Sequence, residues 1–264
     1  RMGDELLLSK ADVGPGTIVA MPQAYAGAAL LPLDNGQVAL VDPTNGKPRA
    51  LPFQPRLEPG LKVRWTRPSV FGGDTPEFVI ADNRQRIYRV ALKDQPNLHL
   101  ALQAEAELPG VPVAPVAANS DAAYVILRTS EGDAIHPMVM PDFAAHAPVP
   151  LKGRVVQGPW SIENQILLVT DTEGLVALGS DHQVKWTAPL PSVPLAGAPR
   201  IEGDSILLAT RLGVVLKVGL VDGKPQGQLN LGSPLFNAPS TYGNRLLIGG
   251  SEGAFYALPG LQAP

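Results

Sequence analysis

The residue types that carry out most protein chemistry occur in this chain without a spacing typical of a catalytic or metal site. The chain has no cysteine, which removes thiolate catalysis, disulfides and cysteine-ligated zinc. Residues 249–253, Gly-Gly-Ser-Glu-Gly, lack the lysine of a phosphate-binding loop and instead predict a hairpin turn. The histidines are not paired as H-x-H or H-E-x-x-H. They are His99, His136, His146 and His182. We therefore predict no catalytic residue and no metal site.

Acidic residues recur in a more regular way. Each follows an apolar run and falls in the turn before the next one. A ring of such carboxylates could bind a cation or a basic partner. Alternatively, Asp and Glu are present because they suit tight turns, and both interpretations stay open. The residues are Asp34, Asp82, Glu131, Asp171, Glu173 and Glu252.

The elements that would position these side chains belong to a repeat. Residues 158–178, 198–218 and 238–258 share one plan: a proline, a turn, a short aliphatic run, a turn ending in glycine, and a second aliphatic run. Weaker copies upstream give the prolines a spacing of 46, 47, 44, 40 and 40 residues. A period of roughly 40 to 45 residues with several short strands per unit is typical of β-propeller blades. The prolines are Pro22, Pro68, Pro115, Pro159, Pro199 and Pro239.

The sequence therefore predicts an all-β protein, a β-propeller of six four-stranded blades in a single domain spanning 1–264. Fourth, outer strands are expected near 49–53, 98–105, 145–151, 184–188 and 226–231. The segment 98–108 also suits a helix, but its alternation of apolar and polar residues favours a strand. The units lie near 15–55, 62–108, 109–151, 152–190, 191–231, and 232–258 plus 4–12.

The last unit lacks an outer strand of its own. Residues 5–9 contain three consecutive leucines and are followed by a glycine and a proline at nearly the same spacing as the strand that precedes Pro239. We expect Glu5–Ser9 to complete this blade and close the ring, because an open ring leaves strand edges unpaired.

Six residues lie where the chain enters the innermost strands, and we call them the inner-strand set. They are Gln23, Arg67, Gln157, Trp160, Arg200 and Asn237. Arg and Trp are enriched in binding surfaces, so these residues are the predicted binding site, near the channel mouth. An acidic or extended peptide would suit it. Trp160 could equally pack between blades as a core aromatic.

The repeat resembles that of pyrroloquinoline-quinone-type propellers. The matching positions are Gly174, Ala177, Asp181 and Trp186, with Asp42, Gly46 and Lys47 in the first unit. Quinoprotein dehydrogenases of this kind have eight blades, many tryptophans and a calcium site, whereas this chain has three tryptophans and no alignable calcium set. The resemblance therefore implies neither pyrroloquinoline quinone nor calcium. Non-enzymatic members resemble the chain better, among them the propeller lipoprotein of the bacterial β-barrel assembly machinery, which implies a periplasmic or cell-envelope location.

Composition and charge argue against a nucleic-acid partner and a transmembrane segment. The net charge of −3 and a pI near 5.8 give no basic footprint for nucleic acid. Residues 13–33 carry no charge, but their three prolines predict strand–turn–strand, not a transmembrane segment. The first ten residues show no signal peptide.

Two classes of function follow. The favoured one is a monomeric, non-catalytic β-propeller that acts as a protein-interaction or assembly scaffold, either alone or as a module of a larger bacterial protein. The alternative is a small-molecule enzyme, quinoprotein dehydrogenase-like or lactonase- or hydrolase-like, with its site at the channel mouth. The fold alone does not distinguish these classes.

Overall fold

A computed structural model describes residues 10–58, 60–130, 132–243 and 245–259, and this part of the chain is built from β-strands. It contains no α-helix, only a single 3-10 turn at Ser251–Gly253. The chain divides into two compact units. Unit 1 holds the described residues up to Arg128 together with Ile135–Pro148, and unit 2 holds Thr129–Ala134 and the chain from Val149 onward.

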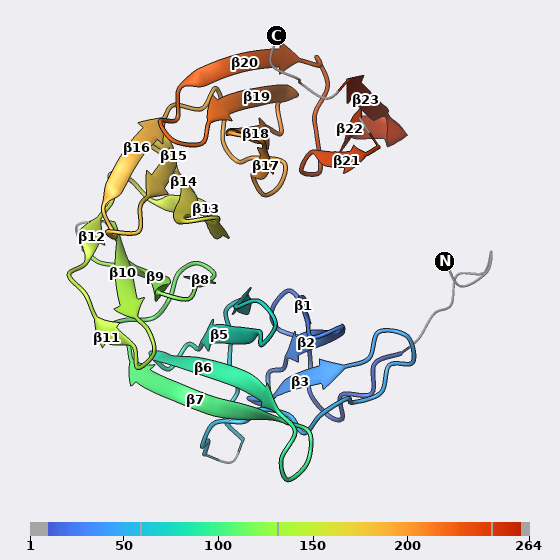
Figure 1. The fold of residues 1–264 in the computed structure, drawn as a ribbon, viewed down its shortest axis with the longest axis vertical. Coiled ribbons are helices and arrows are strands. Elements are labelled where there is room, and N and C mark those ends of the chain that lie inside the picture. Colours follow the sequence, from blue (N-terminus) through green and yellow to red (C-terminus); the bar gives the residue numbers. More distant parts are fainter. Residues whose placement is uncertain (1–9, 59, 131, 244, 260–264) are drawn as a thin grey trace. The chain divides into compact units, whose positions relative to one another are not determined.

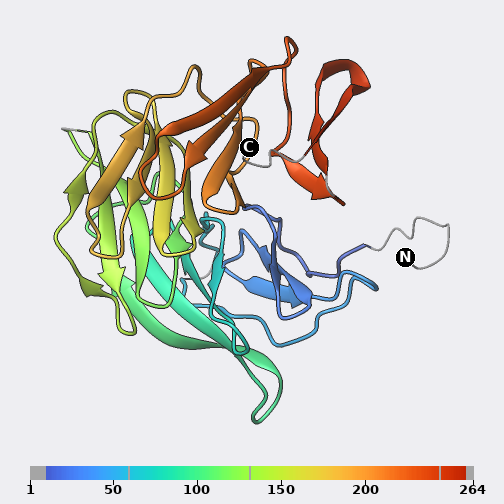
Figure 2. The same cartoon turned by 45° about the horizontal axis from the view of Figure 1, so that its top comes forward.

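Unit 1 contains antiparallel sheets in the orders β1-β2-β3 and β4-β5-β6-β7, and most of a third in the order β11-β10-β9-β8 (Figure 1). The β6–β7 hairpin is the longest, and its turn projects beyond the sheet in both views (Figures 1 and 2). The strands are β1 (Gln23–Tyr25), β2 (Ala28–Pro32), β3 (Val38–Val41), β4 (Ser69–Phe71), β5 (Glu77–Ala81), β6 (Arg86–Lys93), β7 (His99–Glu107), β8 (Ala117–Ala118), β9 (Ala122–Arg128), β10 (Asp133–Val139) and β11 (Ala144–Ala145).

Unit 2 repeats the plan with sheets in the orders β13-β14-β15-β16, β17-β18-β19-β20 and β21-β22-β23. A short strand, β12, pairs with β10. The strands are β12 (Val149–Pro150), β13 (Val155–Ile162), β14 (Gln165–Thr170), β15 (Gly174–Leu178), β16 (Val184–Ala188), β17 (Arg200–Glu202), β18 (Ser205–Ala209), β19 (Val214–Gly219), β20 (Pro225–Asn230), β21 (Ser240–Tyr242), β22 (Arg245–Gly249) and β23 (Phe255–Pro259).

The central strands read as unbroken apolar runs because both faces of each sheet are covered. In β5, Phe78 and Ile80 join a cluster with the first sheet, while Val79 and Ala81 join a cluster with the third. Successive side chains of a strand point to opposite faces, so a strand packed on both sides needs apolar residues at every position. In unit 2, the sheets β13–β16 and β17–β20 likewise share one buried cluster.

The outer strands follow the prediction in some sheets and depart from it in others. The segment expected to be strand or helix is the strand β7, and those expected at 184–188 and 226–231 are β16 and β20. Residues 49–53 form only single bridges, to β3 and to the start of β7. The segment 145–151 is broken into β11 and β12, which both pair with β10. The predicted closing strand, Glu5–Ser9, lies outside the described residues.

One backbone link recurs before the innermost strands. A residue there forms an antiparallel bridge with the end of the second strand of the same sheet. Because this link uses backbone atoms, it recurs although the residue types differ. The bridges are Ile18–Leu33, Trp65–Asp82, Pro112–Leu127, Leu195–Thr210 and Leu235–Gly250.

Candidate functional site

In unit 1, the structure brings together two members of the inner-strand set. Arg67 donates from Nε and Nη2 to Oε1 of Gln23, at 3.1 and 2.7 Å. Gln23 begins β1 and Arg67 precedes β4, so this pair joins the inner strands of adjacent sheets. Both side chains are half-buried. The guanidinium has five donors in all, which leaves it further capacity for a ligand.

In unit 2, three members of the set bond to neighbouring strands. The Gln157 amide bonds to both backbone groups of Leu195 and so ties β13 to the segment before β17. Arg200 donates to the Thr241 hydroxyl at 2.8 Å, which links β17 to β21. Asn237 accepts the backbone N–H of Gly249 at 2.6 Å. Each of these contacts joins strands, and a binding role for these residues stays a prediction.

Trp160 lies in β13, opposite Leu167 of β14. Its partly buried ring packs against the cluster shared by the sheets β13–β16 and β17–β20. This is the packing that the alternative interpretation of Trp160 predicts. A binding role for the part of the ring that stays accessible is a further prediction. Because the inner-strand set is divided between the two units, its gathering into one site also stays a prediction.

Two of the recurrent turn acids, Asp34 and Asp171, form hydrogen bonds with the backbone, whereas Glu131 and the Glu252 side chain lie outside the described residues. Asp34 accepts the backbone N–H of Thr17, and Asp171 accepts that of Arg154, at 2.9 and 2.8 Å. In the second sheet the same role falls to Asn83, which accepts the N–H of Arg64. A hydrogen bond from Lys62, followed by that from Thr17, lowers the pKa of Asp34, and the Arg154 N–H lowers that of Asp171.

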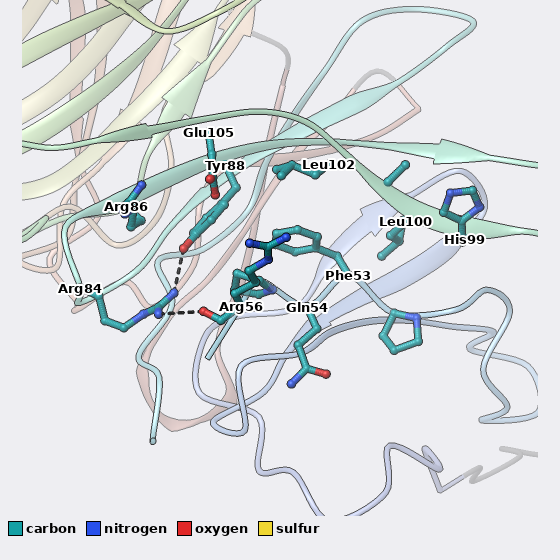
Figure 3. Close-up of a pocket in the computed structure, with 13 residues that line it drawn as sticks. Phe53, Gln54, Arg56, Arg84, Arg86, Tyr88, His99, Leu100, Leu102 and Glu105 are labelled. Atoms are coloured by element: carbon teal, nitrogen blue, oxygen red, sulfur yellow. Dashed lines mark hydrogen bonds between the residues drawn. The ribbon is translucent and has the colours of Figure 1, made fainter. Parts of the chain in front are cut away.

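Sequence reasoning missed a pocket of about 890 Å³ in unit 1. One wall is the segment 52–56, and the other consists of residues 84–88, at the start of β6, and residues 99–105 of β7 (Figure 3). Its charged lining consists of Arg56, Arg84, Arg86 and Glu105. Leu102 supplies the exposed apolar surface, whereas Phe53 and Tyr88, which also line the pocket, are only 4% and 1% exposed. Its volume lies within the range of about 300–1,000 Å³ that ligand sites occupy.

A buried carboxylate organises one end of this pocket. Asp82 is 1% exposed and accepts the backbone N–H groups of Arg84 and Arg86 at 2.8 and 3.1 Å. The Arg84 guanidinium and the Tyr88 hydroxyl both donate to its Oδ2. Arg84 also donates to the Tyr88 oxygen and to the Arg56 carbonyl (Figure 3). Burial, followed by the Asp82 charge, raises the pKa of Tyr88, so its hydroxyl stays neutral.

The pocket rests on an aromatic group within the core of unit 1. Trp65 lies 5.7 Å from Tyr88 and 6.4 Å from Phe53, centroid to centroid, and its indole N–H donates to the Leu33 carbonyl. These contacts pack the rings closely beneath the pocket wall. No motif marks these residues in the sequence. The only available signal is the pairing of Arg84 and Arg86 beside an aspartate.

The described residues contain no group of His, Cys, Asp or Glu that could hold a metal ion. Burial lowers the pKa of His136 in β10, which favours its neutral form. Within the described part of the chain, no helix has the length and apolar character needed to cross a membrane.

Comparison with protein-family models and with curated proteins gives no match for this sequence. Solved structures do match. The computationally designed Ika8 protein aligns with a TM-score of 0.64 at 8% identity, over 92% of this chain and 70% of its own. BBS1N in complex with ARL6DN aligns with a TM-score of 0.62 at 14% sequence identity, over 89% of this chain and 75% of its own. BamB from Moraxella catarrhalis aligns with a TM-score of 0.50 at 12% sequence identity, over 92% of this chain and 85% of its own.

The fold is a β-propeller. This confirms the predicted fold class, whereas the number of blades stays a prediction. Identities of 8–14% are evidence of a shared fold only. The resemblance to pyrroloquinoline-quinone-type repeats is therefore supported for architecture, and the specific family is not shown.

Proposed function

We propose that this protein is a non-catalytic β-propeller that serves as a protein-interaction scaffold. The observation that carries the proposal is the state of the acid–base groups at the pocket of unit 1. Asp82, Arg84 and Tyr88 are hydrogen-bonded to one another, and Asp82 also accepts backbone N–H groups. A general base needs a lone pair directed at its substrate, and both Asp82 oxygens are already occupied by donors. The arrangement suits a rigid binding surface better than proton transfer.

The inner-strand set is the proposed binding face, with Arg67 and Arg200 as its charged members. Arginine binds carboxylates through paired, charge-assisted hydrogen bonds, so the partner would present an acidic or extended segment. BBS1N, which shares the fold, was crystallised in complex with ARL6DN, a precedent for a propeller that binds a protein. The proposed partner is thus a protein or peptide, with the chain itself monomeric.

The test is capture of partners from the source cells by the tagged protein, with the double variant Arg67→Ala/Arg200→Ala compared against wild type. Arg245→Ala, an exposed arginine of β22, is the matched control. We expect a defined set of proteins to be lost from the double variant and kept by the control. Melting temperatures measured in parallel show whether the variant is still folded. Unchanged capture with a clear fall in melting temperature would make both arginines structural links, not binding residues.

The enzymatic alternative predicts a different result. Titration with calcium and then pyrroloquinoline quinone would raise the melting temperature saturably and change the quinone absorbance if the protein were a quinoprotein. We expect neither change, in keeping with a scaffold that uses no cofactor. Saturable stabilisation by the quinone would overturn the proposal.

We further propose a periplasmic or cell-envelope location, on the basis of the repeat resemblance and the structural likeness to BamB. Fractionation of the source cells, with antibodies against this chain, checks it. Recovery in the cytosolic fraction alone would contradict this location.

A further inference from the structure

The outer edge of β7 is partly occupied and partly open. Near its start, the Leu51 N–H donates to the Leu98 carbonyl, and the Leu100 N–H donates to the Leu51 carbonyl, at 2.9 and 3.0 Å. The two segments run parallel at this bridge. Beyond Leu51, the chain leaves β7 and Phe53 pairs with Val38 of β3 instead. In the described part of unit 1, no other strand pairs with this edge of β7.

The open stretch keeps backbone groups that face away from the sheet. Groups of alternate residues in a strand point the same way, so the N–H and C=O of Leu102 point to the same side as those of Leu100. A register shift follows Leu102. After it, Leu108 bonds to Gln85 on the β6 side, and alternation then directs Glu105 and Glu107 outward. The open edge runs for about 20 Å at strand spacing.

The pocket lies beside this open edge. Ala101, Leu102 and Glu105 of β7 line it, facing the segment 52–56. Leu102 is 45% exposed, so apolar surface is available next to the free backbone groups. An exposed edge of this kind is a template for another extended chain.

The charged lining indicates what that chain carries. Asp82 neutralises Arg84. Two further arginines line the pocket, Arg56 and Arg86, and Glu105 is the one carboxylate among the lining residues. Glu107, outside the lining, lies opposite Arg86 in the strand register. Arg56 is exposed; its backbone carbonyl accepts a hydrogen bond from Arg84, and its guanidinium forms no hydrogen bond or ion pair with the described residues. The exposed Arg56 guanidinium is therefore the group beside this edge that favours a carboxylate.

We propose that this pocket is a second docking site, where an extended acidic segment of a partner protein adds to the edge of β7. The inference rests on the proposed scaffold function and deepens it. The segment continues the pairing that Leu51 begins. Aliphatic side chains on one of its faces pack on Leu102, and a carboxylate pairs with Arg56.

The test measures binding of a fluorescein-labelled peptide of about seven alternating valine and aspartate residues, a length that matches the open edge. One control peptide replaces aspartate with lysine. The other carries N-methyl groups at alternate residues, which removes strand pairing and keeps the charge. We expect saturable binding of the first peptide alone. Hydrogen exchange at the amides of Leu102 and Glu105 should slow when it binds.

Three variants locate the site. Leu102→Pro removes the outward N–H, and Leu102→Ala keeps it while removing the side chain. Arg56→Glu should weaken binding by about tenfold or more through loss of a charge-assisted bond. Lys47→Glu makes the same change of charge at another exposed position of unit 1 and should leave binding unchanged. If Leu102→Pro fails to fold, as judged by melting, the N-methyl peptide still tests strand pairing at β7 and Arg56→Glu still tests the charge contact.

Absence of binding at about 1 mM peptide, equal binding of the N-methyl peptide, or equal binding by Arg56→Glu would overturn the docking site. These outcomes leave the scaffold proposal intact if partner capture still depends on Arg67 and Arg200. Conversely, peptide binding at β7 without any arginine-dependent capture would contradict the inner-strand site while supporting this one. A lysine peptide that binds as well as the aspartate peptide would also contradict the charge assignment.

Discussion

At the scale of single residues, polar side chains link neighbouring sheets by bonding to backbone groups. Tyr25 is the clearest case. Its hydroxyl donates to the Pro76 carbonyl at 2.8 Å and accepts the Leu92 N–H at 2.9 Å, so one side chain of the first sheet holds two segments of the second. Burial raises the pKa of Tyr25, and the ring also packs edge-on against Phe78.

Removing this hydroxyl should be costly because two partly buried backbone groups would lose their partner. We expect Tyr25→Phe to lower the free energy of unfolding by about 1–3 kcal/mol, measured by urea denaturation. Tyr242→Phe is the control, since Tyr242 is 77% exposed, and it should change stability little. Equal stability of both variants would mean that water replaces the hydroxyl at no cost.

The turn acids show what sequence can and cannot assign at this scale. The repeat correctly marks turns with Asp34 and Asp171, which hold equivalent backbone N–H groups. It also pairs them with Asp82, but the structural equivalent in that sheet is Asn83, one residue later. Asp82 is buried and bonds to Arg84 and Tyr88 instead. A one-residue offset in a turn does not show in residue type, because Asp and Asn suit the same turns.

At the scale of elements, packing between sheets depends on where glycine lies. Trp186 of β16 packs over the β19–β20 turn. A Cβ atom at Gly223 in that turn would come within 2.3 Å of the Trp186 ring, and the Gly223 φ angle is +65°. The resemblance to the propeller repeat includes Trp186, and its contact with this turn is one physical reason for a tryptophan at that position.

Two glycine substitutions separate backbone strain from steric conflict. Gly232 has a φ angle of +68°, and a Cβ atom at this position would meet nothing within 4 Å. Gly232→Ala should therefore cost only the left-handed backbone penalty of about 1–2 kcal/mol. Gly223→Ala should cost about 1–3 kcal/mol more through overpacking against the indole. Thermal unfolding of both variants measures the difference, and equal melting temperatures would show that the indole moves aside freely.

Element boundaries were predictable where the repeat is strong. The hairpins β14–β15, β18–β19 and β22–β23 fall where the aliphatic runs of 158–258 place them. The outer segment at 49–53 was not predictable in the same way, because its pairing is divided between β3 and β7. That division creates the pocket, which the periodicity of one strand does not reveal.

At the scale of the whole molecule, the β-propeller class was predictable because a fixed period has few architectural solutions. The blade number and the closing strand Glu5–Ser9 stay predictions from the sequence. Deletion of residues 1–9 tests the closure and keeps the Asp12 N–H bonded to the Gly46 carbonyl. If the strand closes the ring, the deletion should lower the free energy of unfolding by about several kcal/mol, because buried aliphatic side chains are lost. A deletion protein that stays monomeric and melts like the parent would contradict closure.

The recurrent bridge before the innermost strands has an evolutionary consequence. Its partners are Ile18, Trp65, Pro112, Leu195 and Leu235, five positions with four different side chains. A frame held by backbone atoms tolerates almost any substitution that preserves an extended conformation. Duplicated units can therefore drift apart in sequence while each one keeps this backbone link. Descendants of one ancestral repeat would then keep their shape long after their common origin has faded from the residues, as the contrast between the regular C-terminal units and the divergent early ones illustrates.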